Sequence, residues 1–173
     1  TMTVSGTMDG VWDGCYKAIN VANGAIKHIP EIAMDGSVAA RLVGEAKFFR
    51  AFNYFTLVKT FGAVPMPTEP YESMDNLYLE RTAVETVYGL IESDLKDAVN
   101  NLPAEKFYSN GNRVTKYAAA MLLTAVYMQE NKYADAASSA KMVIESPHAL
   151  ATNDDLALGS AYNKIRTTDG LDE

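Results

Sequence analysis

The fold of this chain is decided by residues 44–67, which read GEAKFFRAFNYFTLVKTFGAVPMP. Apolar and aromatic side chains cover most of the circumference of a helix drawn over residues 44–61, whereas an ordinary surface helix carries one apolar stripe. We therefore expect this helix to be buried among several others. Gly62 suits the left-handed backbone that follows a helix end, and the prolines between residues 65 and 70 prevent the helix from resuming.

Helical spacing of apolar residues continues on both sides of this stretch. We expect helices over residues 12–29, 38–61, 82–102, 115–128 and 133–145. A capping box of Thr82 and Glu85 is expected to begin the third helix, and Thr115 is expected to cap the fourth.

The other stretches are expected to be irregular: a lead-in over residues 1–10, a proline-rich connection over 62–80 and a tail over 147–173. No persuasive strand is present. The sequence therefore predicts a single all-α domain of about five main helices. The acidic residues Glu92, Asp94 and Asp97 are expected to lie on the solvated outer face of their helix.

The composition narrows the possible partners. The chain has 173 residues and a formal net charge of −7, without a cluster of Lys or Arg. Binding to a phosphate backbone needs concentrated positive charge, so we expect no nucleic-acid partner. The single cysteine, Cys15, excludes an internal disulfide and a multi-cysteine metal site. We find no transmembrane run, signal peptide or catalytic set, and we expect no metal, cofactor or enzymatic activity.

The last two predicted helices resemble the paired helices of a tetratricopeptide repeat. The matching positions are Leu123, Tyr127, Ala136, Ala140 and Val143. The alanines would let the paired helices approach closely while Tyr127 fills the gap beside them. This pattern predicts tetratricopeptide-like helical hairpins. It leaves open a function as an autonomous scaffold for protein–protein interaction, because helical repeats bind peptides in concave grooves.

The long helix and its proline-rich exit resemble the signature of the SusD/RagB family, the outer-membrane nutrient-binding lipoproteins of Bacteroidetes-type bacteria. The residues that carry the resemblance are Glu45, Phe49, Arg50, Phe61, Gly62 and Pro65. A second match lies at residues 111–119, GNRVTKYAA, which resemble the entry to a later helix in the family. The resemblance implies a helical scaffold built from such hairpins.

The same resemblance implies a function. The protein would bind a glycan or another nutrient oligomer, without catalysis, for uptake through a SusC-like TonB-dependent transporter of the outer membrane. It would be a surface-facing lipoprotein of that membrane, held only by a lipid anchor that this chain lacks. Because family members are usually much longer, we expect the chain to be a fragment of a larger SusD-like protein.

Three aromatic residues are candidates for ligand contact. Tyr71 and Tyr78 lie in the proline-rich connection, and binding residues often lie in such irregular segments. Trp12 offers a flat apolar face for a sugar ring, although its place in an apolar helical stripe favours core packing. Glu45 and Arg50 would either grip a ligand as an ion pair or pair with other helices. We favour the structural role because an unpaired buried charge is costly.

Overall fold

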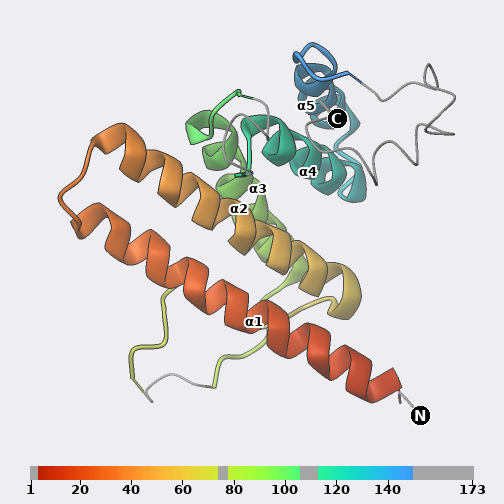
Figure 1. Ribbon diagram of the computed structural model, residues 1–173. Coiled ribbons are helices and arrows are strands. Elements are labelled where there is room, and N and C mark those ends of the chain that lie inside the picture. The colour runs from red at the N-terminus through yellow and green to blue at the C-terminus, as the bar shows by residue number, and fades with distance from the viewer. Residues whose placement is uncertain (1–3, 74–77, 106–112, 150–173) are drawn as a thin grey trace, which may run out of the picture.

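The computed structural model describes residues 4–73, 78–105 and 113–149, and its fold is all-helical as predicted (Figure 1). The helices are α1 (Val4–His28), the short 3₁₀ helix η1 (Ile29–Glu31), α2 (Gly36–Phe61), α3 (Val84–Asn101), α4 (Lys116–Gln129) and α5 (Tyr133–Ile144). In these ranges the only β pairing is one isolated antiparallel bridge between Val64 and Thr82. No helix within them is long and apolar enough to cross a lipid bilayer.

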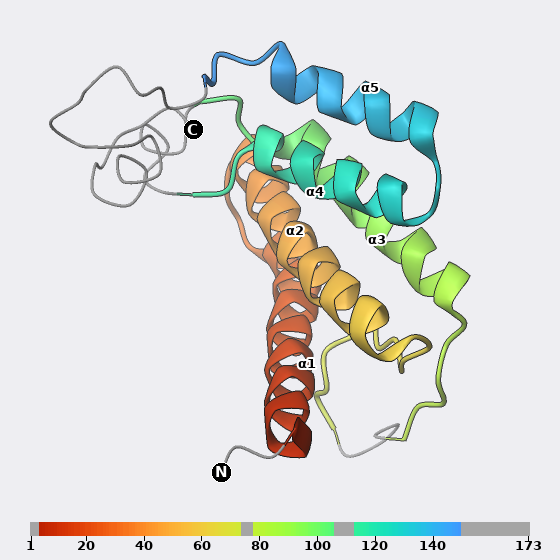
Figure 2. The ribbon, with the colours of Figure 1, turned by 90° about the vertical axis from the view of Figure 1, so that its right-hand side faces the viewer.

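Consecutive helices pack against one another in a layered array. The long helices α1 and α2 form one antiparallel hairpin, α3 lies on the other side of α2, and α4 and α5 form the last hairpin (Figure 2). The main hydrophobic core contains residues of all five α-helices, and Ile19 of α1, Leu57 of α2 and Ile91 of α3 are fully buried in it. Burying a side chain of this size contributes about 1.5–3 kcal/mol. A smaller core of mostly small residues joins α3 to α4.

The helix α2 is not buried all round, contrary to the prediction. It contacts α1 on one side and α3 on the other, and its outer face leaves Phe49 48% and Phe52 49% exposed. The aromatic composition of α2 predicted burial over most of its circumference, whereas two sides are packed and a third side faces outward.

The helix α1 begins at Val4, whereas the sequence predicted a loose lead-in over residues 1–10. Gly6 and Gly10 lie within the helix, and each glycine costs roughly 1 kcal/mol relative to alanine. The next turn carries Val11 and Trp12, which pack against the main core. No proline interrupts the segment, so the anchored turn extends the helix through the two glycines.

The predicted capping box at the start of α3 is wrong. The N-cap residue is Ala83, which makes no side-chain capping bond, and its carbonyl accepts from the N–H of Val87 at 3.1 Å. Thr82 is extended instead, and its N–H donates to the carbonyl of Val64 at 2.9 Å. By contrast, Thr115 caps α4 as predicted, since its hydroxyl accepts from the N–H of Ala118 at 3.4 Å.

Candidate functional site

The proline-rich segment after α2, residues 62–73, runs along α1, and we call it the strap. Its carbonyl groups are bonded by side chains of the helices beneath it. The hydroxyl of Tyr16 donates to the carbonyl of Pro65 at 2.6 Å, and that of Tyr54 donates to the carbonyl of Pro67 at 2.7 Å. Burial raises the pKa of both phenols, so both hydroxyls remain donors.

A second pair of polar side chains holds the middle of the strap. The amide of Asn23 donates to the carbonyls of Pro67 at 3.0 Å and Glu69 at 3.2 Å. The guanidinium of Arg50 lies within 3.4 Å of the carbonyl of Thr68. Because prolines lack an N–H, this segment has few donors for a sheet ladder. Side chains of α1 and α2 therefore take the place that a neighbouring strand would have.

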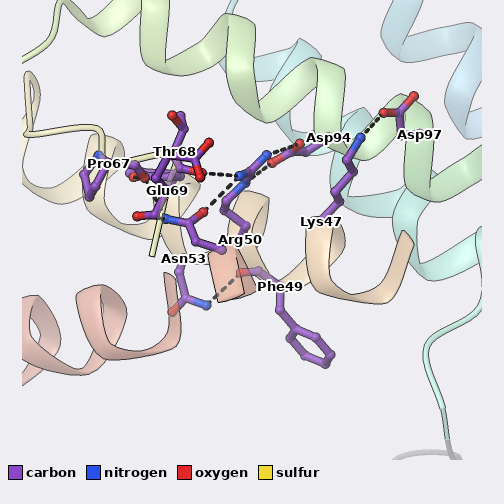
Figure 3. A network of polar contacts seen from close by, with 11 residues as sticks. Lys47, Phe49, Arg50, Asn53, Pro67, Thr68, Glu69, Asp94 and Asp97 are labelled. Carbon is purple, nitrogen blue, oxygen red and sulfur yellow. Dashed lines mark hydrogen bonds and ion pairs between the residues drawn. The ribbon is translucent and has the colours of Figure 1, made fainter. Parts of the chain in front are cut away.

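The strap network is centred on a buried ion pair between α2 and α3 (Figure 3). Nε of Arg50 donates to one carboxylate oxygen of Asp94 at 2.7 Å, and a terminal nitrogen donates to the other at 2.8 Å. The other terminal nitrogen donates to Oδ1 of Asn23 at 2.9 Å. Burial raises the pKa of Asp94, and the guanidinium opposes that rise. Two-pronged Arg–carboxylate pairs fix geometry as well as charge. Because the same guanidinium also contacts Asn23 of α1 and Thr68 of the strap, it joins three helices and the strap.

Sequence reasoning wrongly placed two acidic residues of α3 on the solvated side of the helix. Glu92 is 9% exposed and Asp94 is only 2% exposed. The available signal for Asp94 was its position, because Asp94 lies three residues after Ile91 and four before Ala98 on the buried stripe of α3. An acid on such a stripe needs a buried cation. The aromatic stretch offered Lys47, Arg50 and Lys59, and the structure places Arg50 against Asp94.

Residues 66–73 of the strap, together with Leu79, line a concave pocket of about 410 Å³. Its lining consists of Met66, Pro67, Thr68, Glu69, Pro70, Tyr71, Glu72, Ser73 and Leu79. Tyr71 is 40% exposed, and the acidic residues Glu69 and Glu72 line the same pocket. The strap pocket therefore combines an aromatic residue with carboxylate hydrogen-bond acceptors.

The other two ligand candidates do not line this pocket. Tyr78 is 98% exposed on the segment that leads into α3. Trp12 packs on Tyr16, with ring centroids 4.9 Å apart, and edge-on against Phe61 at 5.1 Å. Its ring is partly buried against the main core, which leaves little of its face for a sugar.

The remaining family residues have separate positions. The carboxylate of Glu45 accepts from two nitrogens of Arg113 at 2.8 and 2.5 Å, which joins the two segments that resembled the family. The side chain of Phe49 points away from the Arg50 network (Figure 3). Gly62 ends α2 with a φ of 71° and a ψ of −128°. This positive φ agrees with the choice of glycine, although the ψ lies outside the left-handed helical region.

A second concavity, also about 410 Å³, lies between α1 and α2. Its lining consists of Lys17, Ala18, Val21, Ala22, Ala25, Ala46, Phe49 and Asn53, and its exposed surface is almost wholly apolar. Specific ligand sites place a few polar groups within an apolar pocket. The strap pocket meets that description better than this groove does. Among the residues that the structure describes, no group of three His, Cys, Asp or Glu side chains could hold a metal ion.

Comparisons with known proteins agree with this geometry. Residues 2–128 match a SusD-like family described as starch-binding and associating with the outer membrane. A SusD-like protein from Formosa agariphila, P25, is 29% identical over 154 residues, which are 88% of this chain and 28% of that protein. The chain thus spans less than a third of the length of this curated relative.

Solved structures show the same helical arrangement. A SusD-like protein from Bacteroides fragilis superposes with a TM-score of 0.76 at 31% identity, over 83% of this chain and 28% of that one. A laminarin-binding SusD-like protein superposes with a TM-score of 0.74 at 33% identity, over 80% of this chain and 30% of that one. The fold of the described helices is therefore shared with carbohydrate-binding proteins.

Proposed function

Since this chain belongs to the SusD-like family, we propose that it binds oligosaccharides at the bacterial surface and does not convert them chemically. The observation that carries the proposal is the family match over residues 2–128, which includes the long helix, the strap and the residues that hold the strap in place. The ligand class follows from the family description and from the laminarin-binding relative of the same fold.

The strap pocket supplies the chemistry for such a ligand. An exposed tyrosine ring offers an apolar face to a sugar ring and a hydroxyl to its edge. The carboxylates of Glu69 and Glu72 accept hydrogen bonds from sugar hydroxyls. The backbone beneath them is fixed by Asn23 and Tyr54, so little ordering is required when a ligand binds.

The charge state of Glu72 suits a hydrogen-bond acceptor and not a general acid. Hydrolysis of a glycosidic bond needs a carboxylic acid whose pKa is raised, so that it can protonate the leaving group. The pKa of Glu72 is lowered instead, because its carboxylate accepts hydrogen bonds from Lys27 and His28. A group that stays ionised at neutral pH is a hydrogen-bond acceptor and a poor general acid.

Calorimetric titration with laminari-oligosaccharides and xylogluco-oligosaccharides tests this proposal. We expect Tyr71→Ala to weaken binding roughly tenfold, the usual effect of removing a central aromatic contact. Tyr78→Ala tests whether the other candidate tyrosine of the proline-rich connection also contributes to oligosaccharide binding. Tyr133→Ala is the matched control, because Tyr133 is an exposed tyrosine at the start of α5. The proposal would be overturned if neither oligosaccharide series binds, or if all variants bind with equal affinity.

The proposal extends to the location and the partner. We propose that the protein is held at the outer membrane by a lipid anchor and delivers its ligand to a SusC-like TonB-dependent transporter. The family description supports the association with the outer membrane. Affinity purification of the tagged protein from detergent-extracted outer membranes should recover such a transporter. Recovery of the protein from the soluble fraction, without a transporter, would contradict this part.

One observation favours the alternative of a protein-binding scaffold. The outer faces of α4 and α5 expose Met121, Met128 and Ile144, which would suit an apolar partner surface. Under this alternative, Met121→Gln would abolish capture of a protein partner and leave oligosaccharide affinity unchanged.

A further inference from the structure

The last turns of α1 hold the end of the strap through three polar side chains. Oδ1 of Asn20 accepts from the N–H of Tyr71 at 2.8 Å. The ammonium of Lys27 donates to one oxygen of Glu72 at 2.7 Å, and Nε2 of His28 lies 2.9 Å from the other. Lys27 and His28 follow Asn20 by seven and eight residues, which is about two helical turns, so the three side chains lie on one face of the helix. They hold two consecutive residues that line the strap pocket.

We infer that Asn20, Lys27 and His28 are positioning residues that hold Tyr71 and Glu72 in place at the pocket, and that this hold depends on protonation of His28. We call the three residues the α1 clasp. The effect of the clasp on ligand affinity rests on the proposed function. The existence of the clasp is independent of that function, because it is a set of contacts within the chain.

The geometry around His28 requires a charged ring. Nδ1 lies 3.0 Å from a carboxylate oxygen of Glu31, and Nε2 lies 2.9 Å from a carboxylate oxygen of Glu72. Ionised carboxylates only accept hydrogen bonds, and a neutral imidazole has a single N–H. Both contacts are hydrogen bonds only when both ring nitrogens carry a proton. Deprotonation therefore turns one of them into a repulsive contact between a lone pair and a carboxylate.

The charged groups around the clasp set the direction of its pH dependence. Hydrogen bonds to Glu31 of η1 and Glu72 of the strap raise the pKa of His28 above its ordinary value of 6.5. Hydrogen bonds from Lys27 and His28 lower the pKa of Glu72 below its ordinary value of 4.5. The hydrogen bond to Glu72 raises the pKa of Lys27, and the negative charge of Glu69 adds to that rise.

These directions define a pH window. The contribution of His28 is fully present below pH 6.5 and is lost as the pH rises through its raised pKa. The contribution of Glu72 is fully present above pH 4.5 and is lost as the pH falls through its lowered pKa. The α1 clasp is therefore complete in mildly acidic solution and weakens under alkaline conditions. Because these side chains are about half exposed, the effect is modest and is screened by salt.

Nuclear magnetic resonance of the ¹⁵N-labelled chain tests the clasp without any ligand. We expect the amide signal of Tyr71 to titrate with the same midpoint as the ring of His28, at a pH above 6.5. His28→Gln should abolish this titration. His148→Gln is the matched control, since His148 is the other histidine and packs on Tyr117 of α4. A Tyr71 signal that ignores pH, or that still titrates in His28→Gln, would overturn the inference.

Affinity for laminari-oligosaccharides tests the functional consequence. Wild type and His148→Gln should bind roughly two- to fivefold more tightly at about pH 5.5 than at about pH 8.5, the range expected for exposed ion pairs. His28→Gln should show no such ratio. An equal ratio in all three proteins would contradict the coupling. If no sugar binds while the Tyr71 amide titrates as described, the proposed ligand is wrong and the clasp stands.

Discussion

Replacing Arg50 tests the reasoning about the buried network most severely. Arg50→Ala leaves the carboxylate of Asp94 without its cation, and Asp94 is almost completely inaccessible to solvent. Removing one partner of such a pair costs about 3–5 kcal/mol. The substitution also removes the donor to Asn23 and the contact with the carbonyl of Thr68. We therefore expect the loss to lie at the upper end of that range.

Two further variants separate charge from geometry. Arg50→Lys keeps the positive charge but cannot reproduce the fork that meets both oxygens of Asp94. We expect it to cost about 1.5–3 kcal/mol, comparable to one lost hydrogen bond to a charged group. The double variant Arg50→Met with Asp94→Leu removes both charges and should recover much of the stability lost in Arg50→Ala. Full recovery is not expected, because Asn23 still lacks its donor.

The chain contains a matched control between the same two helices. Lys47 of α2 pairs with Asp97 of α3, but this ion pair is much more exposed than that of Arg50 (Figure 3). We expect Lys47→Ala to cost less than about 1 kcal/mol. Urea unfolding, followed by circular dichroism and by the fluorescence of Trp12, gives all these free energies. If Arg50→Ala costs no more than Lys47→Ala, the account of the network is refuted.

Four further substitutions have expected outcomes in the same unfolding assay. Gly62→Ala should cost about 1–3 kcal/mol, because a φ of 71° strains any residue with a Cβ. The control Gly89→Ala should instead stabilise α3 by about 0.5–1 kcal/mol. Equal effects of the two substitutions would contradict the backbone explanation. Tyr54→Phe should cost about 1 kcal/mol, since the carbonyl of Pro67 keeps a second donor; a loss several times larger would contradict this. Glu45→Gln should cost less than about 1 kcal/mol and cost less still in high salt, and a salt-independent loss would disagree.

The helices could be predicted because their signals are local. The apolar spacing of α3, α4 and α5 and the glycine after α2 are properties of a few neighbouring residues, and the structure confirms those elements. The start of α1 was missed because packing of Trp12 extends the helix through two glycines. Thr82 was misassigned because its N–H finds a partner in Val64, far away in the sequence. Tertiary contacts decided both cases.

The candidate site was predictable only in part. The proline-rich connection and Tyr71 were identified from composition, and Tyr71 does line a pocket. The residues that hold the connection in place were missed. Asn23 and Asp94 lie on helical stripes that also carry core residues, and their partners come from other elements. A polar residue on an apolar stripe signals a buried partner, but the sequence alone does not say which element supplies it.

The most direct test of the central claim is to map where an oligosaccharide binds on the ¹⁵N-labelled chain. Laminari-oligosaccharide would be added stepwise while the backbone amide signals of the protein are followed. The account predicts saturable shifts concentrated in the strap pocket, with Tyr71 among the largest. Shifts confined to the apolar groove between α1 and α2, or the absence of any saturable shift, would contradict the claim that the strap carries the binding site.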